Sequence, residues 1–369
     1  MTGGDRLLAI DVMRGLTLAL MVVVNMSLGE HSYAQLNHAL WHGLTLTDLV
    51  FPTFMFVVGT ALALNLPRYE QAGGGAFLVK VLRRTALIFL CGYLLYWFPF
   101  FEPDQAGHLA LRPIADTRIF GVLQRIALGY GCAALLLHYG GRRFAAGFAV
   151  VALLAYWLLL AHFGDYTLQG NAVLRLGLFL FGPRHLYHGE GVAFDPEGLL
   201  STLPAIANTL AGYFACDWLQ RSGRSARSVA MLALGGGACV LVGLFWSQWL
   251  PINKKLWTGS FVFVTVGIDL YVLAALTQWF DVAGRRGGTY FFEVLGRNTL
   301  FIYLLSELGN GVLWLAQVHG TSLLAWLYEQ LFRPLAGERF GAFVYALAYL
   351  GACWLAGWWL DRRRIYIRL

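Results

Sequence analysis

The sequence predicts an all-α membrane protein, a polytopic transmembrane helical bundle of about ten spans with both termini in the cytoplasm. Of its 369 residues, 58% are hydrophobic and only 13% are charged, and the mean hydropathy is +0.61. Soluble domains carry about 25% charged residues. Apolar windows of roughly 20 residues, enough to cross ~30 Å of hydrocarbon, recur along the chain. We therefore expect residues 1–369 to form a single transmembrane domain in a lipid bilayer.

The apolar windows place the predicted helices in order along the chain. The expected spans are residues 10–28, 45–65, 82–100, 118–138, 144–162, 198–219, 228–250, 258–280, 289–309 and 340–360. Clusters of arginine and lysine follow alternate spans, at 68–84, 142–143, 221–227, 285–286 and 362–364. Because cytoplasmic loops are enriched in these residues, we assign these clusters and both termini to the cytoplasm. This placement also accounts for the net charge of +7, so no nucleic-acid partner is expected.

The segments between the remaining span ends should face outward, and they are rich in polar and aromatic residues. They cover residues 29–44, 101–117, 163–197, 251–257 and 310–339. Segment 163–197 mixes aromatic residues, histidines and carboxylates, and segment 321–333 has the pattern of an amphipathic interfacial helix. Loops of this length are usually functional. A site on the outward side is the simplest interpretation.

Polar residues also interrupt the predicted spans, where a charge at the bilayer centre costs about 2.5–3.5 kcal/mol. Asp11 and Arg14 have the spacing of a local ion pair on one helix. Asp48 opens its helix, so it could interact with the helix dipole or support catalysis. Arg125 and Arg297 could pair with another side chain or with a substrate phosphate. The other interior polar residues are Asn25, Gln124, Asp269, Asn298 and Glu307.

His38 is the histidine whose context suggests chemistry. It precedes a tryptophan and an aspartate-led helix, and its imidazole can act as a general base or a nucleophile near neutral pH. No HxxxH or HExxH spacing groups the histidines as metal ligands, so no metal is expected. The five cysteines show no paired spacing and are interpreted as packing residues.

Several ordered blocks of the sequence resemble one family of membrane enzymes. The blocks are RLLAIDVMRGLTLALMVVVN at 6–25, NHALWHGLTLTDLVFPTFMFVVG at 37–59, RIFGVLQRIALGY at 118–130, HLY at 185–187, VAFDPEGLLSTLPAI at 192–206, LPINKKLWTGSF at 250–261 and FFEVLGRNTLFIYLLSE at 291–307. They make the chain similar to the heparan-alpha-glucosaminide N-acetyltransferase family of transmembrane acyltransferases, which is lysosomal in animals and has bacterial members. The resemblance implies acetyl transfer from cytoplasmic acetyl-CoA to the amino group of a glucosamine-type sugar across the membrane.

The resemblance also implies roles for three residues in acetyl transfer. His38 matches the catalytic histidine and would act as a base or as a transient acetyl carrier. Asn25 would donate to the developing oxyanion, and Asp48 would orient the imidazole. This chain has Trp41 and His42 where the animal relatives have a different pattern, so His42 is the alternative to His38, which position favours.

Two further groups of residues are expected to bind the two substrates. For acetyl-CoA, the co-substrate, guanidinium groups match phosphate geometry, and the expected contacts are Arg14, Arg125, Arg297, Gln124 and Asn298. For the sugar, the expected contacts are His42, Trp41, Asp195, Glu197, Asn253, Lys254, Trp257 and Glu307. Lys254 and its neighbour Lys255 would face an anionic sugar or lipid headgroup.

Other functions are compatible with intramembrane polar residues. A solute transporter for amino sugars is the main alternative, because aspartate, arginine and asparagine inside glycine-rich spans also describe a solute path. An O-acyltransferase of envelope polysaccharide is a second, and a haem or quinone protein is a distant third. For the enzyme we expect a multi-pass protein of the bacterial inner membrane, with a homodimer as a further candidate assembly.

Overall fold

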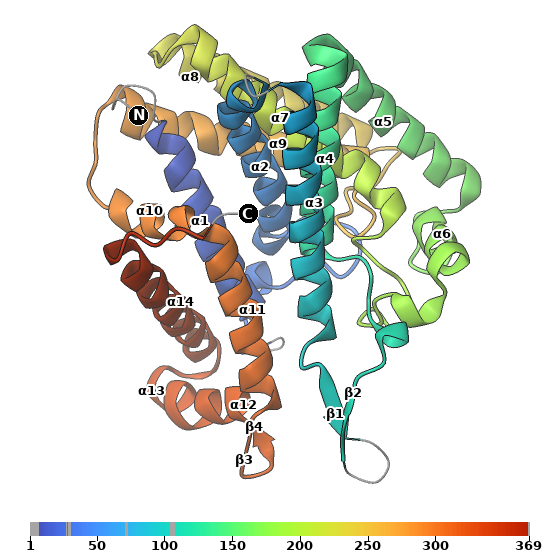
Figure 1. Ribbon diagram of the computed structural model, residues 1–369, viewed down its shortest axis with the longest axis vertical. Coiled ribbons are helices and arrows are strands. Elements are labelled where there is room, and N and C mark those ends of the chain that lie inside the picture. The colour runs from blue at the N-terminus through green and yellow to red at the C-terminus, as the bar shows by residue number, and fades with distance from the viewer. Residues whose placement is uncertain (1–6, 27, 29–30, 71–72, 104–107, 368–369) are drawn as a thin grey trace.

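The computed structural model describes residues 7–26, 28, 31–70, 73–103 and 108–367 of the chain, so parts of the outward segments 29–44 and 101–117 lie outside the described residues. The fold is predominantly helical (Figure 1). The α-helices are α1 (Leu8–Asn25), α2 (Leu46–Glu70), α3 (Gly74–Trp97), α4 (Val122–Leu135), α5 (Gly141–Phe163), α6 (Ala172–Phe181), α7 (Leu199–Ser222), α8 (Ala226–Trp246), α9 (Gly259–Leu276), α10 (Thr289–Arg297), α11 (Thr299–Leu315), α12 (Leu323–Leu327), α13 (Arg333–Ala336) and α14 (Glu338–Arg362).

Short elements complete the fold in the connecting segments. Two antiparallel hairpins pair β1 (Phe101–Pro103) with β2 (Leu109–Leu111) and β3 (Gln317–Val318) with β4 (Thr321–Ser322), and both project from the lower end of the molecule in Figure 1. The remaining elements are short 3₁₀ helices, η2 (Ala34–Leu36), η3 (Ile114–Asp116) and η5 (Pro183–His185), and short π helices, η4 (Leu136–Gly140), η6 (Thr277–Val282) and η7 (Tyr328–Phe332). The amphipathic helix expected over 321–333 is confirmed as helical, because α12 continues into η7 and α13.

Among the described residues, seven helical stretches are long and apolar enough to cross a membrane. One of them, Val122–Phe163, is 42 residues long. A single straight helix of that length would measure about 63 Å at 1.5 Å per residue, twice the hydrocarbon thickness. Gly141 has φ of 73°, which a right-handed helix cannot contain, and α4 and α5 diverge there as two arms (Figure 1). Glycine therefore separates two apolar helices, as the expected spans 118–138 and 144–162 require.

The helix expected over 289–309 is not continuous, because the structure divides it into α10 and α11. Asn298 has φ of −122° and ψ of 41°, and it separates α10 from α11, which run in different directions (Figure 1). The Asn298 side chain bonds the backbone of the C-terminal segment: its amide donates to the Ile365 carbonyl (3.0 Å), and its oxygen accepts from the Ile367 amide (2.9 Å). A long-range contact therefore stabilises the break.

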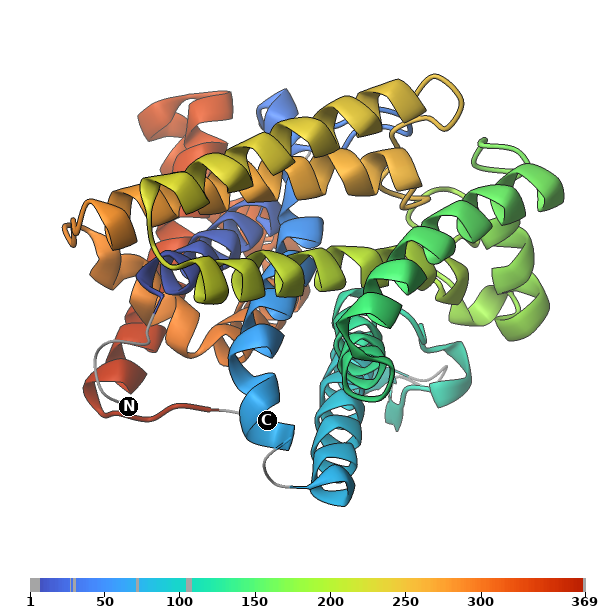
Figure 2. The ribbon, with the colours of Figure 1, turned by 90° about the horizontal axis from the view of Figure 1, so that it is seen from above.

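Glycines lie where the backbones of two helices come into close contact. α2 packs along α7, and a Cβ atom at Gly59 would overlap the Thr209 carbonyl, while one at Gly212 would overlap the Phe56 carbonyl. Such close backbone approach is typical of membrane helices, which lack a hydrophobic driving force between them. α8 and α9 form the other extensive pair and lie side by side in Figure 2.

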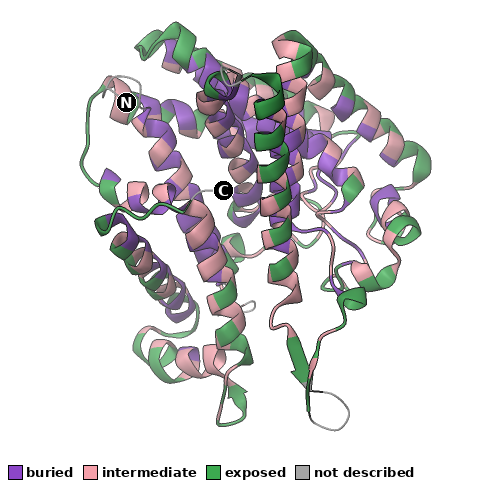
Figure 3. Cartoon of the chain, in the orientation of Figure 1, coloured by how far each residue is buried: buried purple, intermediate pink, exposed green. Residues whose placement is uncertain are grey.

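The outer faces of the bundle are apolar and exposed, which identifies the part of the surface that contacts lipid. Figure 3 shows exposed positions along α3, α5, α8 and α14, while the centre of the bundle is buried. These positions carry large hydrophobic side chains, for example Leu82, Leu90, Val151, Leu158, Leu241, Phe245, Leu355 and Trp359. Monomeric soluble proteins rarely expose contiguous apolar patches of this extent. The all-helical membrane class expected from composition is thus confirmed, and the polar loops gather at the ends of the helices.

Candidate active site

The site is built around Asp48, which lies in the first turn of α2. Its side chain is buried, and its Oδ2 atom accepts hydrogen bonds from the Thr45 amide (3.0 Å), the Thr45 hydroxyl (2.9 Å) and the Ala39 amide (3.1 Å). The Asp48 amide in turn donates to the Thr45 carbonyl (3.2 Å). The bond from the Thr45 amide to a side chain three residues further on is one half of a capping box, and the Asp48 amide uses the Thr45 carbonyl in place of the hydroxyl. The sequence T-L-T-D therefore orients the Asp48 carboxylate through Oδ2. Its other oxygen, Oδ1, makes none of these bonds.

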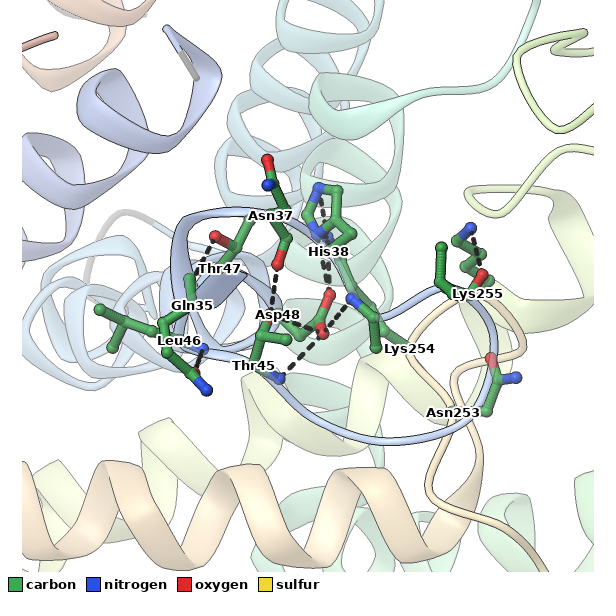
Figure 4. A network of polar contacts seen from close by, with 12 residues as sticks. Gln35, Asn37, His38, Thr45, Leu46, Thr47, Asp48, Asn253, Lys254 and Lys255 are labelled. Carbon is green, nitrogen blue, oxygen red and sulfur yellow. Dashed lines mark hydrogen bonds and ion pairs between the residues drawn. The ribbon is translucent and has the colours of Figure 1, made fainter. Parts of the chain in front are cut away.

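The second oxygen of Asp48, Oδ1, contacts the imidazole of His38. The distance from His38 Nδ1 to Asp48 Oδ1 is 2.8 Å, and 48% of the His38 side chain is exposed (Figure 4). An ionised carboxylate can only accept, so the proton of a neutral ring lies on Nδ1. Nε2 then carries the lone pair of the neutral ring. This arrangement of carboxylate, imidazole and free nitrogen is the one a general base needs.

A second segment, the turn 251–258 before α9, brings Lys254 to the same ring. The backbone amide of Gly43 donates to the Ile252 carbonyl (2.9 Å), which joins this turn to the His38 loop. Lys254 Nζ lies 3.1 Å from His38 Nδ1, 3.2 Å from Nε2 and 3.9 Å from Asp48 Oδ1 (Figure 4). We call residues 31–48, 183–198 and 251–258 together the His38 end of the bundle.

Lys254 is held in a poorly solvated position. Burial lowers the pKa of its amine below the usual value of 10.5, although attraction to Asp48 and Glu197 opposes that change. Repulsion from Lys255 and Arg125 lowers the pKa further. The predicted role of Lys254 was contact with an anionic acceptor, and its contact with the imidazole is a feature that sequence analysis missed.

His42, the alternative histidine, has a different environment. The Asn253 amide nitrogen lies 3.2 Å from His42 Nδ1, and burial lowers the pKa of His42. Asn253 itself is fully buried, and its oxygen accepts from the Leu256 amide (2.8 Å). Trp41 donates from Nε1 to the Tyr166 carbonyl (2.7 Å) and packs edge-on against Phe194. Of the two histidines, His38 is therefore the one paired with a carboxylate.

Next to the His38 end of the bundle, Arg125 lies fully buried in the first turn of α4. Its Nη2 donates to the Pro196 carbonyl (2.8 Å) and to the Ser201 hydroxyl, and its guanidinium lies 4.7 Å from the centre of the Trp257 ring. Trp257 is only 1% exposed and donates to Asn208 (3.0 Å). Its ring therefore packs on an arginine in this structure and presents little surface to a sugar.

Arg125 and its neighbour Gln124 retain unused hydrogen-bonding capacity. The Nε and Nη1 atoms of Arg125 and both amide atoms of Gln124 are buried and have no hydrogen-bond partner within the described part of the chain. Buried polar groups are normally satisfied, so such atoms indicate water or a ligand between the helices. Gln124 lies against Gly92 of α3. These two residues could therefore hold a polar group that enters the bundle.

Arg118 was missed as a site residue, although it opens the block RIFGVLQRIALGY, and a charge just before a span was the available signal. Its guanidinium bonds both oxygens of Asp195 (2.6 and 3.0 Å) and Glu197 (2.6 Å), and it stacks between the rings of Tyr96 and Tyr187. Burial raises the pKa of Asp195 despite Arg118. For Glu197, burial is outweighed by Arg118, Arg125 and Lys254, which lower its pKa.

Replacing Arg118 by alanine is expected to lower the free energy of unfolding by about 3–5 kcal/mol, because it leaves Asp195 as an uncompensated buried charge. Thermal unfolding of the detergent-solubilised protein measures this change. The matched control is Arg184→Ala, since Arg184 is 77% exposed and lies 3.9 Å from Asp116. Exposed pairs contribute about 0–1 kcal/mol. Equal effects of the two substitutions would contradict a structural role for Arg118.

The other residues expected to bind acetyl-CoA lie at the opposite end of the bundle in internal ion pairs. Arg14 Nη1 lies 3.5 Å from Asp11, which is the local pair expected from their spacing. Arg297 bonds Asp361 (2.8 Å) and Glu293 (2.8 Å), and its neighbour Asn298 holds the C-terminal segment. These guanidinium groups have protein partners in the structure, in contrast to the unused donors of Arg125.

Asn25 ends α1 and donates from Nδ2 to Glu307 of α11 (2.5 Å). The structure therefore groups two expected residues with each other rather than with His38. His38, Asp48 and Lys254 form one cluster, and Asp195 and Glu197 form another around Arg118. The part of the chain that the structure describes contains no group of three histidine, cysteine, aspartate or glutamate residues that could hold a metal ion.

The fold and the site define a polytopic helical membrane protein that presents a histidine–carboxylate pair at one end of its bundle. Residues 6–246 match the family described as "Heparan-alpha-glucosaminide N-acetyltransferase, catalytic", and the chain belongs to this family. The heparan-alpha-glucosaminide N-acetyltransferase of Mus musculus is 28% identical over 83% of this chain and 54% of its own length. That of Homo sapiens is 29% identical over 82% and 53%. The chain thus spans about half the length of these curated relatives, and the resemblance stated from sequence is confirmed.

Proposed function

We propose that the protein is a transmembrane N-acetyltransferase that moves acetyl from cytoplasmic acetyl-CoA to the amino group of a glucosamine-type sugar on the external side. The observation that carries this proposal is the His38–Asp48 pair (2.8 Å), in which a buried carboxylate bonds Nδ1 of a half-exposed ring and leaves the lone pair of the neutral ring on Nε2, beside the Lys254 amine. Family membership supports the reaction class, because the named relatives are N-acetyltransferases.

In this mechanism His38 removes a proton from the acceptor amine as the amine attacks the thioester carbonyl carbon. Asp48 keeps the proton of the neutral ring on Nδ1 and stabilises the imidazolium that forms. The imidazolium then returns the proton to the departing thiolate. Transient transfer of the acetyl group to Nε2 is the second route that the same geometry permits. Asn25 uses one amide hydrogen on Glu307 and retains a second for the oxyanion.

The donor would enter between the helices from the end opposite His38. Arg125 and Gln124 are the residues we propose to contact it inside the bundle, because their buried polar atoms lack partners in the described structure. Arg14, Arg297 and Asn298 would contact its nucleotide end after exchanging their internal partners. At the His38 end, His42, Trp41, Asp195, Glu197, Asn253, Lys254 and Glu307 would surround the acceptor, with Trp257 beneath them.

We further propose a single domain of ten spans with both termini cytoplasmic, in the bacterial inner membrane. α2 supports the sidedness: it begins beside His38 and reaches Arg68, and its 24-residue apolar stretch measures about 36 Å. The basic cluster at 68–84 therefore lies a membrane thickness away from the site. Under the positive-inside rule, this separation supports an external position for His38.

The test is acetyl transfer across a sealed membrane. The full-length protein is reconstituted in proteoliposomes with glucosamine trapped inside and labelled acetyl-CoA added outside. We expect N-acetylglucosamine to accumulate inside in molecules oriented with the cytoplasmic face outward, and no product when glucose replaces glucosamine. Movement of glucosamine without acetyl-CoA would instead identify a transporter, and acetylation of glucose would identify an O-acyltransferase.

A further inference from the structure

The amine of Lys254 lies next to the imidazole that the proposed reaction uses as its base. Its Nζ atom is 3.2 Å from His38 Nε2 and 3.1 Å from Nδ1. A general base must be about 2.6–3.2 Å from the atom that carries the proton it removes. The two nearly equal distances place the amine beside the ring and not along the in-plane lone pair of Nε2, so a rotation of the flexible Lys254 side chain is needed to align the two groups. After that rotation the amine faces Nε2, the ring nitrogen that Asp48 does not bind (Figure 4).

Lys255, the next residue, provides an internal comparison. Its Nζ donates to Glu190 (2.6 Å) and to the Leu40 carbonyl (2.9 Å). Figure 4 shows the two lysine side chains pointing apart, with Lys254 toward His38 and Asp48. The Lys255 amine is thus bound by a carboxylate at 2.6 Å, whereas Asp48 Oδ1 lies 3.9 Å from Lys254 Nζ. The two lysines thus differ in partner although they are adjacent in sequence.

The surroundings of Lys254 favour its neutral form more than those of a solvated lysine. Burial is the main cause of its lowered pKa, and the positive charges of Lys255 and Arg125 act in the same direction. The carboxylates of Asp48 and Glu197 oppose the change without cancelling it. A larger fraction of Lys254 is therefore nucleophilic at neutral pH than for an exposed lysine.

We propose that Lys254 is a self-acetylation site, modified by the acyl thioester when no acceptor sugar occupies the site. The neutral Nζ attacks the thioester carbonyl carbon, a C–N bond forms and the C–S bond breaks. His38 Nε2 takes the proton from Nζ and returns it to the thiolate, so the products are Nε-acetyl-lysine and the free thiol. The inference rests on the proposed function, which supplies the thioester and the base.

Self-acetylation has two consequences for the site. It removes the positive charge beside His38, and it leaves an amide whose nitrogen is neither basic nor nucleophilic. An acceptor sugar bound at His38 occupies the same position, so it should protect Lys254. Acetylation of Lys254 therefore indicates that no acceptor sugar was bound at His38.

The experiment uses the full-length protein in nanodiscs, labelled acetyl-CoA and no sugar, followed by mass spectrometry of peptides. The chain has three lysines, Lys80, Lys254 and Lys255, and fragment ions from the bond between the two adjacent ones assign the label to one or the other. We expect label on Lys254 and little on the other two. In His38→Gln the initial rate should fall by about 10²–10⁴, the contribution typical of a general base. Added glucosamine should slow labelling, and the rate should level off at a lower pH than for a solvated lysine because the pKa of Lys254 is lowered.

Three outcomes would overturn the proposal. If Lys254 stays unlabelled while the same preparation acetylates glucosamine, self-acetylation is wrong and the proposed function stands. If His38→Gln labels Lys254 at the wild-type rate, the reaction is uncatalysed and the lysine is merely reactive. If neither Lys254 nor glucosamine is acetylated, both proposals fail. A melting temperature like that of the wild type shows that His38→Gln is folded.

Discussion

Replacing His38 by alanine is expected to lower kcat for glucosamine acetylation by about 10²–10⁴, because the substitution removes the proposed base or acetyl carrier. The fold should be retained, since 48% of the His38 side chain is exposed and the ring lies outside the hydrophobic core clusters. Initial rates with saturating acetyl-CoA measure the effect. The rate of thermal unfolding provides the parallel check on structure.

The matched control for this substitution is His162→Ala. His162 lies near the end of α5, is exposed, and packs edge-on against Phe163. Its removal should leave kcat within about twofold, because surface substitutions away from special features change little. A His38→Ala protein that remains folded and acetylates glucosamine at the wild-type rate would remove the basis of the proposed mechanism.

Replacing Asp48 by asparagine is expected to have an effect of similar size, for a reason that the hydrogen bonds specify. Oδ2 of Asp48 accepts from Ala39 and from both the amide and the hydroxyl of Thr45. An asparagine must keep its oxygen toward these donors, so its NH₂ group faces His38. Nδ1 of the ring then has to accept, the proton moves to Nε2, and the base loses its lone pair. We expect kcat to fall by about 10²–10⁴, up to the effect of the equivalent change in serine proteases.

This second prediction separates a catalytic role of Asp48 from a helix-capping role. Asparagine can retain the acceptor side of the capping box, so a purely structural Asp48 predicts little change in either stability or kcat. Nitrogen chemical shifts of labelled histidine report which ring nitrogen carries the proton. We expect kcat to fall, the unfolding temperature to stay unchanged and the proton of His38 to move to Nε2. An unchanged kcat would show that Asp48 only caps the helix.

Local sequence was sufficient for the features that depend on local physics. Apolar length and low charge predicted the membrane class and most helices, because a spanning segment has to satisfy its backbone internally and present apolar side chains to lipid. The pair of His38 and Asp48 was also within reach, since ten residues and one capping turn separate them. The histidine–carboxylate pair is thus encoded in a single stretch of chain.

Contacts between segments that are far apart in the chain could not be predicted from the local sequence. The break at Asn298 is stabilised by the C-terminal backbone 67 and 69 residues away. Arg118 pairs with Asp195, 77 residues further along the chain, and Arg297 pairs with Asp361, 64 residues further along. In the sequence each of these is an isolated polar residue beside apolar ones. Its partner depends on which helix ends meet in space.

The sequence by itself determined that this chain is a helical membrane protein with a histidine at a helix entrance and a membrane acetyltransferase pattern, because hydrophobicity, charge bias and ordered motifs are properties of neighbouring residues. Only the tertiary structure decided that Lys254 lies at the His38 ring, 216 residues away, and that Arg125 rather than Arg14 or Arg297 keeps unused donors within the described bundle. Burial and pairing of charges arise from the packing of separate helices, and that packing is what sets which groups remain available for chemistry.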